Sequence, residues 1–178
     1  YGVACAMNYL HSMNILHRDI DSGNILLNGK LYPYLSGFST SIRADDVMTE
    51  EEIQATTPRI MAPEFLENYE KYSRTKPIDV YSYGMVLYQL LTEQEINNNE
   101  CNIVCIEKVI RGERPKFPSD NSPSENWQKL ICACWDQVPE NRPTFEQICD
   151  ILETPDFVTP DIDSNLFNIY KNKVNNYQ

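Results

Sequence analysis

The chain has 178 residues, of which 42% are apolar and 23% are charged, as is usual for one globular domain that can bury a core. Its 26 acidic residues outnumber its 15 basic residues, and the net charge of −11 argues against nucleic acid or an anionic membrane as a partner. Both of those partners select for patches of lysine and arginine. An acidic, solvated surface that aids solubility is the simplest interpretation of this surplus.

The sequence predicts neither a membrane span nor a cysteine-based metal site. The apolar stretch over residues 80–91 is interrupted by polar side chains and is too short to cross a bilayer. The six cysteines are Cys5, Cys101, Cys105, Cys132, Cys134 and Cys149. They include no pair with the C-x₂-C spacing of a zinc site. Reduced, mostly buried thiols in a cytoplasmic protein are therefore expected.

Hydrophobic patterning predicts a mainly helical (α+β) chain. A helical period of apolar residues covers residues 2–13, and two apolar runs flank an Asn-Gly turn in a hairpin over residues 25–35. An irregular segment is expected over residues 37–64. Further helices are expected near residues 79–92, 102–112, 125–135 and 144–153. The helix over 79–92 is apolar nearly all round, which predicts a buried central helix around which the others pack.

Local signals mark several of these helix ends. Ser122 and Glu125, with a proline between them, predict an N-cap and capping box at the start of one helix. Thr144 and Gln147 predict a similar box at the start of the next helix. Gly112 is expected to close the helix that precedes it.

Residues 17–24 read HRDIDSGN, which resembles the catalytic loop H-R-D-L-x-x-x-N of protein kinases. The resemblance implies that Asp19 accepts the proton of a substrate hydroxyl and that Asn24 holds a Mg²⁺ ion. It also implies that the residue two places after the first Asp is a lysine that steadies the transferring phosphate of Ser/Thr kinases. Here that position is Asp21, an acid.

Residues 34–41 read YLSGFSTS, where a protein kinase reads roughly K-I-S-D-F-G-L-S. Gly37 therefore stands where the family has the Asp that binds the nucleotide's metal, and Phe38 stands in its Phe position. The thirteen positions from Asn24 to Gly37 match the family spacing. A rival register that starts at Ser36 aligns neither the Phe nor the flanking serines. In either register the metal-binding carboxylate is missing.

Three further motifs extend the resemblance. Residues 55–64 resemble the end of an activation segment that closes on A-P-E, and residues 79–92 resemble the central helix of the kinase large lobe. Residues 134–145 resemble the closing C-W…R-P-T-F signature, in wording most like the tyrosine-kinase-like branch of Ser/Thr kinases. The resemblance covers residues 1–155 and leaves residues 156–178 as a C-terminal tail.

The family pattern implies a structural set that includes His17 and Phe38. It pairs Glu64 of A-P-E with Arg142 of the R-P-T-F stretch, and it binds the carboxylate of Asp79 to the backbone of the catalytic loop. A carboxylate at a helix N-terminus is also favoured on physical grounds.

Two further residues have roles that depend on the activation segment. Thr57 matches the threonine that braces the catalytic loop, usually through the missing lysine, and it indicates Ser/Thr ancestry. Arg18 would normally bind a phosphate on the activation segment, for which the candidate acceptors are Thr49, Thr56 and Thr57. The alternative is constitutive pairing of Arg18 with the neighbouring acids Asp45, Asp46, Glu50, Glu51 and Glu52.

The 178 residues contain neither the G-x-G-x-x-G loop that covers ATP phosphates nor a V-A-I-K strand. Residues 1–11 already resemble the helix that precedes the catalytic loop. The expectation is a kinase large (C-terminal) lobe whose small N-terminal lobe is absent. ATP and Mg²⁺ then belong to the ancestry of the chain, and no cofactor is expected to bind it.

The changes at positions 21 and 37 predict that phosphotransfer is lost. A unit charge at ~4 Å is worth about 4 kcal/mol at an effective dielectric near 20, and a combined loss of ~6 kcal/mol slows a reaction by more than about 10⁴-fold. The first hypothesis is a pseudokinase that binds or scaffolds unknown protein partners. The alternative is a Ser/Thr kinase completed by a small lobe encoded elsewhere, and a decaying gene product is the third. A cation site made by Asp19, Asp21 and Asn24 alone would be weak.

Overall fold

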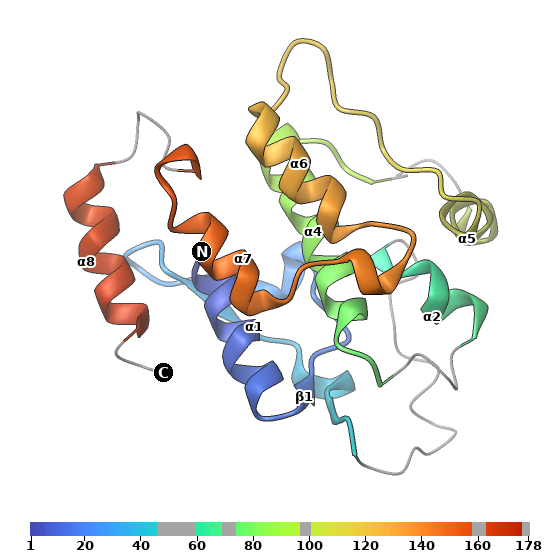
Figure 1. The fold of residues 1–178 in the computed structure, drawn as a ribbon, viewed down its shortest axis with the longest axis horizontal. Helices are drawn as coiled ribbons and strands as arrows, with labels where there is room; N and C mark the ends of the chain where they lie inside the picture. Colours follow the sequence, from blue (N-terminus) through green and yellow to red (C-terminus); the bar gives the residue numbers. More distant parts are fainter. Residues whose placement is uncertain (46–59, 69–73, 97–100, 158–162, 176–178) are drawn as a thin grey trace.

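A computed structural model describes residues 1–45, 60–68, 74–96, 101–157 and 163–175, and these ranges are mostly helical with a few short strands (Figure 1). The helices are α1 (Gly2–Ser12), α2 (Pro63–Glu67), α4 (Pro77–Thr92), α5 (Asn102–Ile110), α6 (Glu125–Cys134), α7 (Phe145–Leu152) and α8 (Ser164–Asn175). The strands are β1 (Ile15–Leu16), β2 (Ile25–Leu27), β3 (Pro33–Leu35) and β4 (Ile42–Arg43). Short 3₁₀ turns cover Ser22–Asn24, Phe38–Thr40, Pro139–Asn141 and Pro155–Phe157.

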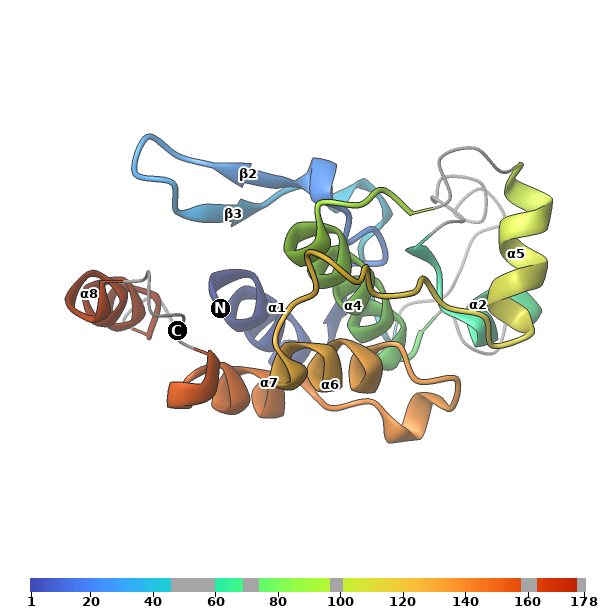
Figure 2. The same ribbon diagram turned by 90° about the horizontal axis from the view of Figure 1, so that it is seen from above.

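Helix α4 is the buried central helix that the sequence predicts. Twelve of its 16 residues are buried, so only a narrow edge of the helix faces solvent. Figure 2 shows it between α1 on one side and α2 and α5 on the other. Gly84 lets α6 approach closely, because a Cβ atom at this position would lie 2.8 Å from the Cβ of Cys134.

Helices α1 and α7 form the second half of the core. Helix α1 buries Ala4, Cys5, Met7 and His11 on one face, which follows the helical period of its apolar residues. That face packs against α7, which buries Phe145, Ile148 and Leu152. Burial of these side chains from both helices fixes α1 beside the loop over residues 17–24 that follows it.

Two of the three predicted helix-end signals are present. The Thr144 side chain accepts a hydrogen bond from the Gln147 N–H, and the Gln147 side chain accepts one from the Thr144 N–H. Gly112 has a left-handed φ of +84° and donates its N–H to Val109 O, while Glu113 N donates to Lys108 O. These two bonds make the Schellman ending that glycine favours.

The predicted capping box at Ser122 and Glu125 is wrong. Helix α6 begins at Glu125, its N-cap is Ser124, and no side chain caps it. The reason is a competing contact, in which Gln128 Nε2 donates to Ser122 Oγ at 3.0 Å and to Pro123 O at 2.8 Å. The amide of Gln128 thus uses the hydroxyl group that the sequence pattern assigned to the helix backbone.

The hairpin forms as predicted, and a second strand pair adds to it. Strands β2 and β3 are antiparallel, with Leu26 opposite Tyr34. Strands β1 and β4 also pair, with Leu16 opposite Ile42, which joins the chain before the loop over residues 17–24 to the segment after it. A two-residue strand has no detectable period, so the sequence did not predict this pair.

Helices α2 and α8 were not predicted. Helix α2 lies at the end of the segment that was expected to be irregular, and α8 lies in the segment that was expected to be a tail. Helix α8 packs against α1 and below the β2–β3 hairpin, where the ring centroids of Tyr170 and Tyr32 are 4.7 Å apart (Figure 2).

Within the described ranges, none of the helices has the length and apolarity needed to cross a bilayer.

A buried ion pair joins the start of α2 to the segment before α7. Arg142 donates two parallel hydrogen bonds to the carboxylate of Glu64, at 2.7 and 2.8 Å, in the pairing that the sequence resemblance implies. Arg142 also donates to Pro77 O at 3.0 Å and to Asp136 O at 2.9 Å. Because both side chains are buried and their polar atoms are satisfied, the pair fixes segments that are 78 positions apart.

We predict that Glu64→Ala or Arg142→Ala lowers the free energy of unfolding by about 3–5 kcal/mol, because each change leaves a buried charge without its partner. The matched control is Lys129→Ala, which breaks the exposed pair between Lys129 and Glu125 on α6 and should barely change stability. Urea denaturation midpoints measure the three variants. Equal shifts for the buried and exposed pairs would contradict the structural role given to Glu64 and Arg142.

Candidate functional site

Asp79 fixes the backbone of the loop over residues 17–24. Its Oδ2 accepts a hydrogen bond from His17 N at 3.0 Å, and its Oδ1 accepts one from Arg18 N at 2.7 Å. Nε2 of His11 lies 2.8 Å from the same Oδ2 atom, at the end of α1. Asp79 is fully buried in the first turn of α4, where the positive end of the helix dipole stabilises a carboxylate. One side chain thus joins the loop, α1 and α4.

His17 connects this loop to the segment after the hairpin. Its ring is fully buried, Nε2 donates to Ser36 O at 2.8 Å, and Nδ1 accepts from Asp19 N at 3.3 Å. A carbonyl can only accept, so the ring hydrogen resides on Nε2. The His17 carbonyl accepts a hydrogen bond from the hydroxyl of Thr40. The rings of His17 and Phe38 pack edge to face, with their centroids 4.9 Å apart.

Arg18 is buried with a positive φ of 68°, a conformation that costs about 1–3 kcal/mol and is stable only where the surroundings impose it. The Asp79 bond to its N–H is one such constraint. The candidate phosphate acceptors Thr49, Thr56 and Thr57 lie outside the described residues, and so do Asp46 and the glutamates at 50–52. Asp45 is described, and its carboxylate accepts a hydrogen bond from Asn14 at 2.8 Å. The two hypotheses for Arg18 therefore remain predictions.

Asn24 lies against Asp19, and its amide nitrogen faces the acid. Nδ2 of Asn24 donates to the carboxylate Oδ2 of Asp19 at 2.8 Å and to the backbone oxygen of Asp19 at 2.9 Å. Both partners are acceptors, so the nitrogen and not the oxygen of the amide must face them. The hydrogen bond to Oδ2 engages one carboxylate oxygen of Asp19, the residue to which the resemblance assigns the role of base.

Asn24 also fills the space beside Gly37. A Cβ atom at Gly37 would lie 2.4 Å from Cγ and Oδ1 of Asn24 and 2.7 Å from its Nδ2. Gly37 has a left-handed φ of +80°, which glycine adopts without strain. The Asn24 amide therefore occupies the space that the side chain of any residue larger than glycine would need at position 37. The placement of this amide depends on the absence of a side chain there.

Asp21 has a local structural contact. Its Oδ1 accepts a hydrogen bond from Gly23 N at 2.8 Å, which caps the 3₁₀ turn over Ser22–Asn24. Aspartate commonly stabilises turns in this way, and the side chain is half-buried and not fully exposed. The acid at position 21 thus stabilises the loop conformation while it adds negative charge beside Asp19.

A Mg²⁺ ion does not fit this arrangement, because it takes oxygen ligands in a nearly ideal octahedron. Position 37 has no carboxylate, the Asn24 nitrogen faces Asp19, and Asp21 is bound to the backbone N–H of Gly23. Among the described residues, no three His, Cys, Asp or Glu side chains are grouped so that they could hold a metal. The ligand role that the resemblance gives Asn24 stays a prediction.

The sequence analysis missed two contacts at this site. Nothing in the sequence indicates that Asn24 fills the volume beside Gly37, because the two residues meet only after the hairpin folds back. It also did not single out His11, which is buried against Asp79 and the ring of Phe145. The only available signal for His11 was a polar residue at the end of the apolar period over residues 2–13.

Comparison with known proteins agrees with the motif assignment. The family described as protein tyrosine and serine/threonine kinase matches residues 1–152. The RGS domain-containing serine/threonine-protein kinase A of Dictyostelium discoideum is 36% identical over 165 residues, which is 93% of this chain and 14% of that protein. The mitogen-activated protein kinase kinase kinase 12 of Rattus norvegicus is 35% identical over 162 residues, or 86% of this chain and 18% of that protein.

A plant protein gives a similar match. The serine/threonine/tyrosine-protein kinase HT1 of Arabidopsis thaliana is 34% identical over 158 residues, or 86% of this chain and 38% of that protein. In each of these three comparisons the chain spans less than two fifths of the relative's length.

We predict that Gly37→Ala destabilises the protein by about 2–4 kcal/mol, from the left-handed backbone and the overlap with Asn24. Combining it with Asn24→Ala, which removes the overlapping amide, should cost at least about 1 kcal/mol less than the sum of the two single changes. Gly29→Ala is the control, because a Cβ atom there would meet nothing within 4 Å. Strictly additive effects in urea denaturation would show that the two residues do not share this space.

Proposed function

The chain belongs to the protein tyrosine and serine/threonine kinase family, and on this basis we propose that its 178 residues form a large lobe that has lost phosphotransfer and acts by binding another protein. The observation that carries the proposal is the contact of Asn24 with Asp19 in the space beside Gly37. The resemblance assigns these three positions to the base and the metal. Here the Asn24 amide donates to Asp19 and lies in the space that a side chain at position 37 would need.

Electrostatics supports the loss of phosphotransfer. The reaction depends on positioning and on neutralising the negative charge that develops on the phosphoryl group. Gly37 supplies no metal ligand, and Asp21 adds a negative charge where the Ser/Thr branch has a cation. A loss of ~6 kcal/mol from these two changes slows the reaction by more than about 10⁴-fold. One carboxylate oxygen of Asp19, the group that the resemblance assigns as the base, is already hydrogen-bonded by the Asn24 amide.

The frame around the loop supports a binding role, because it remains complete although the chemistry has changed. Asp79 still binds the loop backbone, and Glu64 still pairs with Arg142. Such contacts keep the outer surfaces of the fold in place whether or not phosphate is transferred. We propose the cytoplasm as the compartment, in keeping with six cysteines that form no disulfide.

We predict that Mg-ATP does not raise the melting temperature beyond the effect of Mg²⁺ alone, because the site offers neither a metal carboxylate nor a cation at position 21. A ligand at 100 times its Kd adds about 2.7 kcal/mol, which is several degrees for a chain of this size. Thermal melts with both additives give the comparison. A shift of several degrees that requires nucleotide would contradict the proposal.

The matching activity test uses a chimaera in which a complete small lobe from an active relative precedes this chain. With its natural residues the chimaera should transfer no radiolabelled phosphate to a Ser/Thr substrate. The variant Asp21→Lys/Gly37→Asp should transfer a measurable amount, once the new Asp displaces the amide of Asn24. Measurable transfer by the chimaera with natural residues, equal to that of the variant, would favour the alternative, a Ser/Thr kinase that works with these residues.

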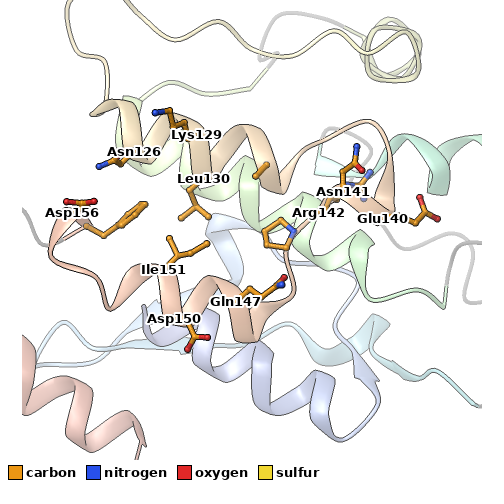
Figure 3. Close-up of a pocket in the computed structure, with 13 residues that line it drawn as sticks. Asn126, Lys129, Leu130, Glu140, Asn141, Arg142, Gln147, Asp150, Ile151 and Asp156 are labelled. Carbon is orange, nitrogen blue, oxygen red and sulfur yellow. The ribbon is translucent and has the colours of Figure 1, made fainter.

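A groove between α6 and α7 is the binding surface that we propose. It has a volume of about 740 Å³, and apolar side chains that include Leu130, Ile151 and Phe157 line it (Figure 3). Glu140, Asp150 and Asp156 lie at its ends and lower edge in Figure 3. The groove is therefore apolar within and acidic at its rim.

Charge complementarity indicates the occupant. Of the two basic residues that line the groove, Lys129 is paired with Glu125 at 2.7 Å, and Arg142 is buried against Glu64. The rim therefore retains a net negative charge, in a chain whose net charge is −11. An amphipathic segment of a partner protein, with apolar residues on one face and lysine or arginine on its flanks, matches both the floor and the rim.

We predict that a short amphipathic peptide of leucine and lysine binds the chain roughly tenfold more weakly after Asp150→Lys/Asp156→Lys, because two rim attractions become repulsions. The control Glu113→Lys/Asp120→Lys makes the same change of net charge away from the groove. Fluorescence anisotropy measures both affinities. An equal loss in the control would mean that the peptide responds only to the overall charge of the chain and not to the groove.

A further inference from the structure

Two cysteines from distant parts of the sequence meet where α1 packs on α7. Sγ of Cys149 lies 3.4 Å from Sγ of Cys5, although 144 positions separate the two residues. Cys5 is almost fully buried, whereas Cys149 is half-buried, so the pair has one side toward solvent. No disulfide joins them. Neither the kinase resemblance nor the proposed binding role uses this pair.

We propose that Cys5 and Cys149 form an oxidation site, at which a peroxide converts the two thiols into an intramolecular disulfide that ties α1 to α7. The proposal is independent of the proposed function, because both cysteines lie in the core between these helices and outside the loop and the groove. The site requires only that the two sulfur atoms meet in the folded chain.

The separation of the sulfur atoms allows the bond to form without unfolding. A disulfide has an S–S distance near 2.05 Å, so the atoms must approach by about 1.4 Å from their separation of 3.4 Å. Rotation of two short side chains and a small shift of the helices can supply this movement. The product would link two helices that already contact each other along their length.

The two thiols differ in acidity, which indicates which of them reacts first. A hydrogen bond donated by the Cys149 thiol lowers the pKa of Cys5 to about 7, against the opposing effect of burial. The same contact raises the pKa of Cys149 well above its ordinary value. A substantial fraction of Cys5 is therefore a thiolate at neutral pH, and the thiolate is the nucleophile.

The reaction has two steps and balances with peroxide as the only oxidant. The Cys5 thiolate attacks one oxygen of hydrogen peroxide, the O–O bond breaks, and the products are Cys5 sulfenic acid and hydroxide, which takes up a proton to become water. The Cys149 sulfur then attacks the sulfenic sulfur, the S–O bond breaks, and a second water leaves with the Cys149 proton. Two thiols lose two electrons and two hydrogens, and peroxide is reduced to two waters.

The other cysteines serve as internal comparisons. Cys134 is fully buried, and burial raises the pKa of its thiol, so it should react slowly. Cys101 and Cys132 are exposed and can be oxidised between molecules. Replacing these two exposed residues with serine gives a background in which the proposed disulfide can be measured as an internal bond.

The experiment treats this Cys101→Ser/Cys132→Ser protein with hydrogen peroxide and maps its peptides by mass spectrometry without reduction. The expected product has lost two hydrogen atoms and contains one linked pair of peptides, which carry Cys5 and Cys149. The link should raise the melting temperature by roughly 10 °C, because it restrains a long loop in the unfolded chain, and dithiothreitol should reverse the rise. The oxidation rate should increase with pH through a midpoint near 7 and level off about one pH unit higher, as Cys5 becomes fully a thiolate.

A second variant, Cys149→Ser, tests which of the two sulfur atoms reacts with peroxide. In this variant the sulfur that would attack the Cys5 sulfenic acid is missing. The sulfenic acid should therefore accumulate and be labelled by dimedone. The proposal is overturned if Cys5 and Cys149 are both alkylated as free thiols after peroxide treatment while exposed cysteines of the unsubstituted protein are oxidised. It is also overturned if the linked peptides pair Cys5 with another cysteine.

Discussion

The rest of the site depends on the hydrogen bonds that the carboxylate of Asp79 accepts. It lies fully buried in the first turn of α4 and binds two successive backbone N–H groups of the loop and the ring of His11. A buried charge of this kind is stable only because all of these donors are in place. One side chain on the central helix thus constrains the start of the loop, including the left-handed Arg18.

Under the proposed function, the site keeps its structural frame but has lost its chemistry. The frame consists of Asp79, His17 and the Glu64–Arg142 pair, and each of these keeps its hydrogen-bond partners. The chemistry required carboxylates and a cation near the phosphate, and here position 37 is Gly and position 21 is Asp. A frame can outlast its chemistry because folding depends on burial and hydrogen bonding, whereas catalysis depends on charges at a few exposed positions.

The proposed binding groove and the proposed thiol site both involve helix α7. Helix α7 lines the groove with Asp150 and Ile151 and also carries Cys149, which meets Cys5 of α1. The helix can do both because neighbouring residues on a helix point in different directions, about 100° apart. A shift of α7 relative to α1 would therefore move the α7 side chains that line the groove.

The sequence by itself determined the family, the central helix, the hairpin, the pairing of Glu64 with Arg142 and the bond of Asp79 to the loop backbone. These features depend on hydrophobic period and on motifs of high specificity. Local patterns were less certain: the box at Thr144 formed, whereas the one at Ser122 lost its hydroxyl to Gln128. Only the tertiary structure decided the amide of Asn24 beside Gly37, the β1–β4 pair and the meeting of two cysteines 144 positions apart. These contacts join residues distant in the chain, and their distances depend on how whole helices and strands pack, which no local pattern encodes.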